Sequence, residues 1–367
     1  MRRASALRSI AAAWTIAACA GPSSDLTPKE AAAERAYAAG RYLEAAGHFA
    51  EAATASAKPR DREEARYRQG MSLERAGRND DARAVLETLL REHPLGERVP
   101  RARYDIALVD LEQGRTDDGQ RELDALIRSY PASGPAPTAL HRHVEWLLDG
   151  TGGEPAARAY LQALAPVIAT TSLAEYVDYE HARSHEREGD LDGARTEYVA
   201  LAARYPYPRG VFWDDALFRA GDIDVTLGDP NAAIAMFERL LAEREPSFMQ
   251  GSYERGRYAD AAFRLAELYR DALHDPARAR QAFERFSTAY PTSRLRDDAS
   301  WNAARLAASA GDGDGACRLL RSLVAASPES RYVACAPVIC PAIRPPQNTS
   351  DTRNTGQCHE YLLRTGP

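Results

Sequence analysis

The sequence lacks the signatures of a catalytic or nucleotide-binding site. It contains no P-loop, no nucleophile elbow and no Gly-x-Gly-x-x-Gly that follows a strand pattern. β-Branched residues are sparse, whereas Ala, Leu, Arg and Glu dominate, which excludes a mainly β fold and favours helices. We therefore predict an all-α protein that is not an enzyme and needs no cofactor.

An excess of positive charge is also missing. The 47 Lys and Arg residues are outnumbered by 53 Asp and Glu residues, which leaves a net charge of −6 at pH 7. A mildly acidic surface repels phosphate backbones, and no zinc-finger or basic-helix pattern is present. Nucleic acid is therefore excluded as an expected partner.

The first apolar run, residues 10–18, is too short to span a bilayer. It follows Arg2, Arg3 and Arg8 and ends in Ile16-Ala17-Ala18-Cys19, which resembles the lipobox of bacterial lipoproteins. The resemblance implies a signal peptide over 1–18, lipidation of Cys19 with palmitate-like chains that anchor the protein in a membrane, and a short linker over 19–27. The alternative is an ordinary secretory signal. Ala20, in place of Asp, favours the periplasmic face of the outer membrane.

A helix-turn-helix frame recurs along the chain after this leader. Around Gly77, for example, small residues stand at Gly70 and Ala82, large apolar residues at Leu86 and Leu89, and proline at Pro94. The turn positions are 36 to 46 residues apart, at Gly40, Gly77, Gly114, Gly153, Gly189, Gly228, His274 and Gly311. Small residues let two helices cross closely, and proline ends the second helix. The frame resembles the tetratricopeptide repeat and implies an α-solenoid of about eight repeats over 28–330.

Residues 279–306 carry the clearest copy of this frame, including Tyr290-Pro291-Thr292-Ser293. This stretch is similar to repeats of the Tol–Pal coordinator protein and of the tetratricopeptide-repeat lipoprotein of the barrel-assembly machinery. The similarity implies a scaffold that binds envelope proteins or peptide segments, in outer-membrane protein assembly or in the coordination of envelope constriction.

Aromatic residues recur at the fifth position of the first helix of the repeats, a position that faces the concave groove in tetratricopeptide proteins. Tyr, Trp and Arg are the residue types that anchor interfaces. We therefore predict a partner-binding groove formed by Tyr67, Tyr104, Tyr179, Arg183, Arg187, Phe218, Trp301 and Arg305. Two alternatives stay open, namely that the rings only pack against neighbouring helices, or that they bind peptidoglycan or another glycan.

Two patterns in the sequence suggest a metal. His181 and His185 are four residues apart and share a helical face, but Ala182 stands where a zinc protease would need glutamate. The sequence Gly311-Asp312-Gly313-Asp314-Gly315 lacks the later ligands of a calcium loop. The histidines are therefore interpreted as solvated, and no metal site is predicted.

Four of the five cysteines lie in a Cys- and Pro-rich tail, 331–367, or just before it. An even number in an exported protein indicates two disulfides. A turn at 327–330 would send the chain back along the last helix, so that Cys317 faces Cys340 and Cys335 is left to pair with Cys358. A Cys335–Cys340 bridge remains a rival. Because Pro337, Pro341, Pro345 and Pro346 disfavour helices, we expect disulfides, and no capping helix, to close the last repeat.

Overall fold

The computed structural model describes residues 28–243, 255–344 and 358–363, and contains only helices and turns in these ranges. Cys19, the leader and most of the insertion at 247–256 lie outside the described residues. The chain divides into two compact units between Trp146 and Leu147. None of the described helices is long and apolar enough to cross a membrane.

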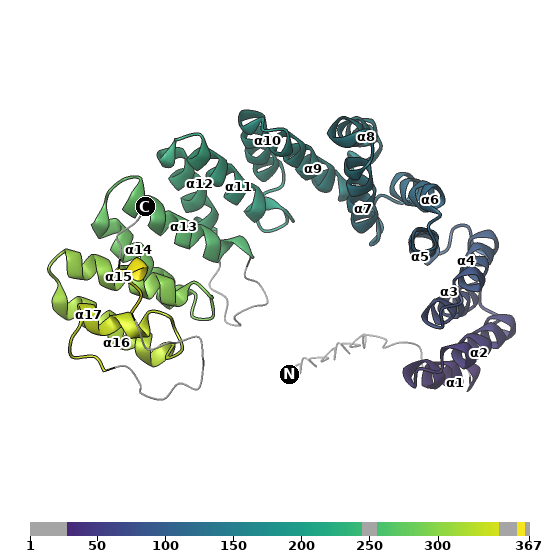
Figure 1. The fold of residues 1–367 in the computed structure, drawn as a ribbon. Coiled ribbons are helices and arrows are strands. Elements are labelled where there is room, and N and C mark those ends of the chain that lie inside the picture. The colour runs from purple at the N-terminus through teal and green to yellow at the C-terminus, as the bar shows by residue number, and fades with distance from the viewer. Residues whose placement is uncertain (1–27, 244–254, 345–357, 364–367) are drawn as a thin grey trace, which may run out of the picture. The chain divides into compact units, whose positions relative to one another are not determined.

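The first unit is built from paired helices (Figure 1). Its helices are α1 Pro28–Ala38, α2 Tyr42–Ala55, α3 Pro59–Arg75, α4 Asn79–Glu92, α5 Val99–Glu112, α6 Thr116–Ser129 and α7 Ala136–Asp149, the last of which crosses the division between the units. From α1 to α6, each helix packs on the next one in the sequence.

The second unit continues the pattern and ends in short helices. Its elements are α8 Gly153–Ile168, α9 Leu173–Arg187, α10 Leu191–Arg204, α11 Trp213–Thr226, α12 Pro230–Ala242, α13 Arg257–Asp271, α14 Pro276–Ala289, α15 Arg296–Ser309, α16 Gly313–Ala326, η1 Val333–Cys335, α17 Ala336–Ile339 and η2 Glu360–Leu362. From α8 to α17, each helix again packs on its successor. The prediction of an all-α chain of helix-turn-helix units is confirmed.

The eight predicted turn positions are the described residues with positive φ. The seven glycines among them have φ between 49° and 81°, and His274 has φ of 51°. A left-handed residue ends one helix and reverses the chain without a steric penalty when it has no Cβ. The repeat frame read from the sequence therefore coincides with the helix pairs of the structure.

The small residues of the frame lie where helices cross. A Cβ on Gly70 would lie 2.7 Å from Cδ2 of Leu86, so glycine is what lets α3 and α4 approach. Ala82, Leu86 and Leu89 are fully buried beneath this crossing. The core of this repeat thus consists of a small residue on one helix and large apolar residues on the other.

Candidate protein-interaction surface

The aromatic residues at position five join the first helix of one repeat to the first helix of the next. The Tyr67 hydroxyl on α3 donates to Asp105 Oδ2 on α5 at 2.9 Å, and the Tyr104 hydroxyl accepts a hydrogen bond from Arg142 Nε on α7 at 3.1 Å. Tyr67 and Tyr104 are buried. Each hydroxyl therefore forms a hydrogen bond with a charged side chain of the next repeat.

The same arrangement recurs in the second unit. The Tyr179 ring stacks on Phe212 with ring centroids 4.0 Å apart, and its hydroxyl donates to Asp215 on α11. Burial and this hydrogen bond raise the pKa of Tyr179 to about 12. The half-buried ring of Phe218 carries the guanidinium of Arg257, from α13, at 4.9 Å from its centre.

The three predicted arginines are also engaged by neighbouring groups. Arg183 donates to Glu180 at 3.0 Å, and Arg187 makes two hydrogen bonds, at 2.8 and 3.0 Å, to the carboxylate of Glu154 on α8. Arg305 donates to the carbonyl of Leu363 at 3.2 Å. Arg187 thus links α9 to α8 and Arg305 links α15 to the C-terminal segment, whereas the Arg183 contact lies within α9.

Burial leaves little surface of the five aromatic rings at position five open to a ligand. Four of its five rings are less than one-tenth exposed, from Trp301 at 2% to Tyr67 at 9%. Stacking on a sugar requires planar faces open to solvent. The structure therefore places these rings mainly in contacts between repeats, and the glycan alternative lacks the exposed aromatic faces that it needs.

The last repeat is covered by the C-terminal segment. Trp301 stacks on Tyr332 with centroids 5.0 Å apart and donates from Nε1 to the Leu362 carbonyl at 3.1 Å. Val333, Cys335, Ala336, Cys340, Ile343 and Leu362 pack into the same apolar cluster. The segment supplies the cap that the open end of a repeat array requires.

Two disulfides hold this cap. Cys317 is bridged to Cys340, with Cα atoms 5.3 Å apart, and Cys335 is bridged to Cys358, with Cα atoms 4.6 Å apart. This is the pairing that the hairpin argument favours. Two short apolar elements, η1 and α17, lie in the cap beside the disulfides, and neither is a polar capping helix. Pro337 lies in the first turn of α17, where its missing N–H costs no hydrogen bond.

Removal of the Cys335–Cys358 bridge should destabilise the cap. We expect the double variant Cys335→Ser/Cys358→Ser to lose about 2–4 kcal/mol of unfolding free energy, because the bridge restricts the unfolded chain. Denaturant unfolding measures the loss, and peptide mapping of the non-reduced wild type establishes the bridges. The matched control, Cys317→Ser/Cys340→Ser, leaves residues 358–363 tied over Trp301, so only the first variant should shift tryptophan emission to the red. Four free thiols in the wild type would contradict this picture.

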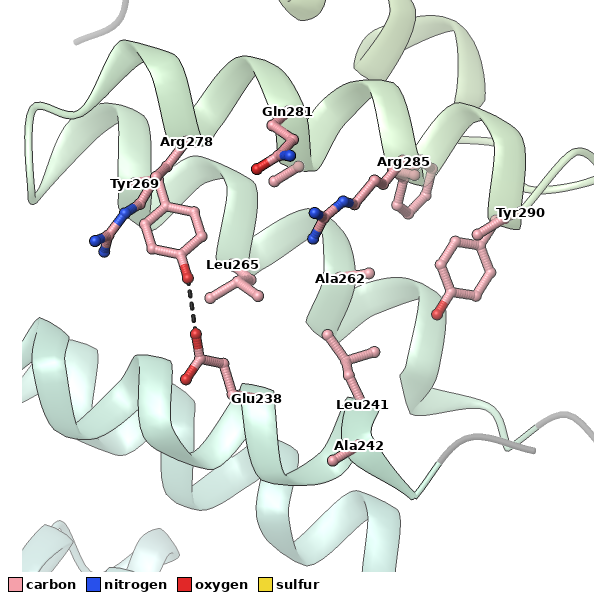
Figure 2. A pocket seen from close by; sticks show the side chains of 13 residues that line it. Glu238, Leu241, Ala242, Ala262, Leu265, Tyr269, Arg278, Gln281, Arg285 and Tyr290 are labelled. Carbon is pink, nitrogen blue, oxygen red and sulfur yellow. Dashed lines mark hydrogen bonds between the residues drawn. The ribbon is translucent and has the colours of Figure 1, made fainter. Parts of the chain in front are cut away.

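A pocket of about 690 Å³ lies between α12, α13 and α14. Its apolar floor is formed by Leu241, Ala262, Leu265, Phe286 and other side chains, and its polar rim by Glu238, Arg278, Gln281 and Arg285 (Figure 2). The Tyr269 hydroxyl donates to Glu238 Oε1 at 2.9 Å. Arg278 forms a salt bridge of 3.3 Å with Asp275. We call this site the α12–α14 groove.

Arg285 is a charged group of the groove that is available to a ligand. Its side chain is exposed, extends from α14 over the pocket in Figure 2, and has no ion-pair partner among the residues that the structure describes. An unpaired guanidinium beside an apolar floor suits a carboxylate carried on an amphipathic segment.

Sequence reasoning missed this groove because its lining comes from three helices between residues 238 and 290. The one available signal was the spacing of Arg278, Gln281 and Arg285, which places all three on one face of a helix.

The histidines interpreted as solvated acquire a third neighbour in the structure. His181 and His185 on α9 lie with Glu197 of α10, and the potential ligand atoms are within 4.8 Å of one another. The spacing in the sequence predicts that the two histidines share a helical face. The carboxylate of Glu197 lies near them only because α10 packs on α9.

One model of the tetratricopeptide repeat matches residues 64–95, 101–133 and 260–293. A second tetratricopeptide-repeat model matches residues 218–272. The matched segments overlap the helix pairs α3–α4, α5–α6, α11–α12 and α13–α14. The chain therefore contains tetratricopeptide repeats, and the predicted tetratricopeptide-repeat α-solenoid is confirmed as the fold class.

Solved structures of low sequence identity share parts of this architecture. A tetratricopeptide-repeat protein from Cytophaga hutchinsonii is 14% identical, with a TM-score of 0.46 over 73% of this chain and 97% of its own. One from Parabacteroides merdae is 15% identical, with a TM-score of 0.35 over 73% and 94%. The type IV pilus biogenesis factor PilW is 15% identical, with a TM-score of 0.40 over 64% and 97%. The comparison with curated proteins finds no match. No functional conclusion follows from similarities at this level.

Proposed function

We propose that the protein is a lipid-anchored scaffold of the bacterial envelope that binds an acidic, amphipathic segment of a partner protein in the α12–α14 groove. The observation that carries the proposal is the exposed Arg285, which has no ion-pair partner among the described residues, beside the apolar floor of the groove. Tetratricopeptide repeats commonly act as scaffolds for protein–protein interaction, which agrees with a binding role.

The chemistry of the groove defines the partner segment. Leu241, Leu265 and Phe286 offer apolar contact for side chains spaced three or four residues apart on a helix. Glu238 already accepts a hydrogen bond from Tyr269. A carboxylate of the partner segment would therefore form its ion pair with Arg285. A hydrogen-bonded ion pair with a guanidinium is among the stronger polar contacts in proteins. The segment should therefore present an apolar face flanked by Asp or Glu.

The resemblance of residues 16–19 to a lipobox supports a membrane-bound setting for this scaffold. The first described helix begins at Pro28, so residues 20–27 would separate the lipid from the repeats. Eight extended residues span at most about 28 Å, which would hold the repeats close to the membrane surface. Partners would then be envelope proteins, and the similarity of residues 279–306 favours outer-membrane assembly or coordination of constriction as the process.

The test combines a cross-linking probe with charge reversal. We expect a photo-reactive phenylalanine derivative at Gln281 to cross-link the partner in cells, and Arg285→Glu to reduce that adduct at least about tenfold through loss of the ion pair. The matched control is Arg321→Glu, an exposed arginine on α16 with no salt bridge among the described residues, which should leave the adduct unchanged.

Mapping of the cross-linked peptide completes the experiment. The proposal requires a segment with an acidic residue, and changing that residue to lysine should restore the adduct in the Arg285→Glu protein. An adduct that survives Arg285→Glu, or that forms equally with a probe at position 321, would show that the groove is not the binding site.

A further inference from the structure

The helix pair α9–α10 brings together three side chains suited to a transition metal. His181 and His185 lie one helical turn apart on α9, with ring centroids separated by 5.2 Å. Glu197 reaches them from α10, and the candidate ligand atoms of all three lie within 4.8 Å of one another. Glu197 is partly exposed and forms no salt bridge within the described parts of the chain. We propose that these residues form a Zn²⁺ site that clamps the two helices of this repeat.

The required movement is small. Ligands of a tetrahedral zinc ion, with bonds of about 2.0–2.2 Å, lie roughly 3.4 Å from one another. Glu197 can close the remaining distance by a change of rotamer, because no salt bridge among the described residues holds its carboxylate. Two imidazoles and one carboxylate are ligand types that Zn²⁺ accepts, and they leave a fourth position for water or a side chain of a partner.

A second carboxylate orients one of the histidines. Nδ1 of His185 lies 2.7 Å from Oδ2 of Asp190. A proton shared along this contact leaves Nε2 as the nitrogen that can coordinate a metal, as in the carboxylate–histidine–metal arrangement of many zinc sites. Asp190 is itself held in place, because its Oδ1 accepts from the backbone N–H of Gly193 at 3.1 Å and caps α10.

Gly193 provides the space for this contact. A Cβ at position 193 would lie 2.2 Å from Oδ2 of Asp190 and 2.8 Å from Nδ1 of His185. Any larger residue would therefore displace the carboxylate or the ring. Asp190 and Gly193 also form the N-cap of α10, as Asp312 and Gly315 do for α16, so the feature specific to the histidine pair is the third ligand, Glu197.

Titration of the purified, tag-free and metal-stripped protein with ZnCl₂ tests the proposal. Calorimetry should show one saturable site per chain with a dissociation constant at or below micromolar. His181→Ala and His185→Ala should each weaken binding at least tenfold, and Glu197→Gln should weaken it measurably. Asp190→Asn, which leaves every ligand present, should lower the affinity by about 10–100-fold.

Three further measurements test whether zinc binding is specific to this site. The control His141→Ala removes an exposed histidine that lies 3.4 Å from Glu145 on α7, and it should leave zinc binding unchanged. Co²⁺ should give the visible absorption bands of a tetrahedral site in the wild type and not in His181→Ala. Far-UV circular dichroism of each variant separates loss of a ligand from loss of fold. Absence of saturable zinc binding, or binding that persists in a His181→Ala/His185→Ala double variant, would overturn the proposal.

Discussion

Trp301→Ala should lower the free energy of unfolding of the C-terminal repeat by about 3–5 kcal/mol, the usual cost of removing a large buried ring. Trp301 is 2% exposed, stacks on Tyr332 and donates its indole N–H to the Leu362 carbonyl. Its removal would leave a cavity between α15 and the cap and an unpaired carbonyl above it. The residue that sequence analysis assigned to a binding groove is thus expected to act on stability.

Hydrogen exchange and denaturant unfolding together measure this effect. Because neighbouring repeats can unfold separately, protection should be lost first over α15, α16 and the cap, while α9 to α12 keep theirs. The control Trp146→Ala removes a tryptophan that is 37% exposed and should cost less than about 1 kcal/mol. A loss no larger than in this control would mean that the cap does not depend on the Trp301 ring.

Cys19→Ser should transfer nearly all of the protein out of the membrane fraction, or leave it as a precursor that keeps its leader. The proposed anchor depends on acyl chains attached at this residue. Stable membrane attachment requires more than one acyl chain. All of the proposed acyl chains are attached at Cys19, so loss of this residue removes the whole anchor.

Cell fractionation and labelling with an alkyne analogue of palmitate report on this variant. The wild type should take up the label and Cys19→Ser should not. Ala20→Asp is the matched control, because it alters the adjacent residue, should keep the label, and changes only the signal that sorts lipoproteins between membranes. Normal processing and unchanged membrane fractionation of Cys19→Ser would refute the lipoprotein assignment.

The sequence by itself determined the helix pairs and their turns. A glycine with positive φ, a small residue at a crossing and a proline after a helix act within a few residues, so their effects can be read along the chain. This is why the frame around Gly77 and the turn at His274 predicted the observed units. The pairing of Cys317 with Cys340 was within reach for the same reason, because one turn brings the two segments together.

Only the tertiary structure decided which side chains are available for binding. Tyr67 finds its acceptor, Asp105, 38 residues away, and Trp301 finds Leu362 61 residues away, so their burial depends on packing that position-five periodicity does not contain. Arg285 is exposed in the α12–α14 groove, where Glu238 of α12 pairs with Tyr269 instead, and Glu197 comes near His181 because α10 packs on α9. Periodicity specifies the face of a helix on which a residue lies, whereas exposure, pairing and ligation are set by what the next helix brings opposite that face.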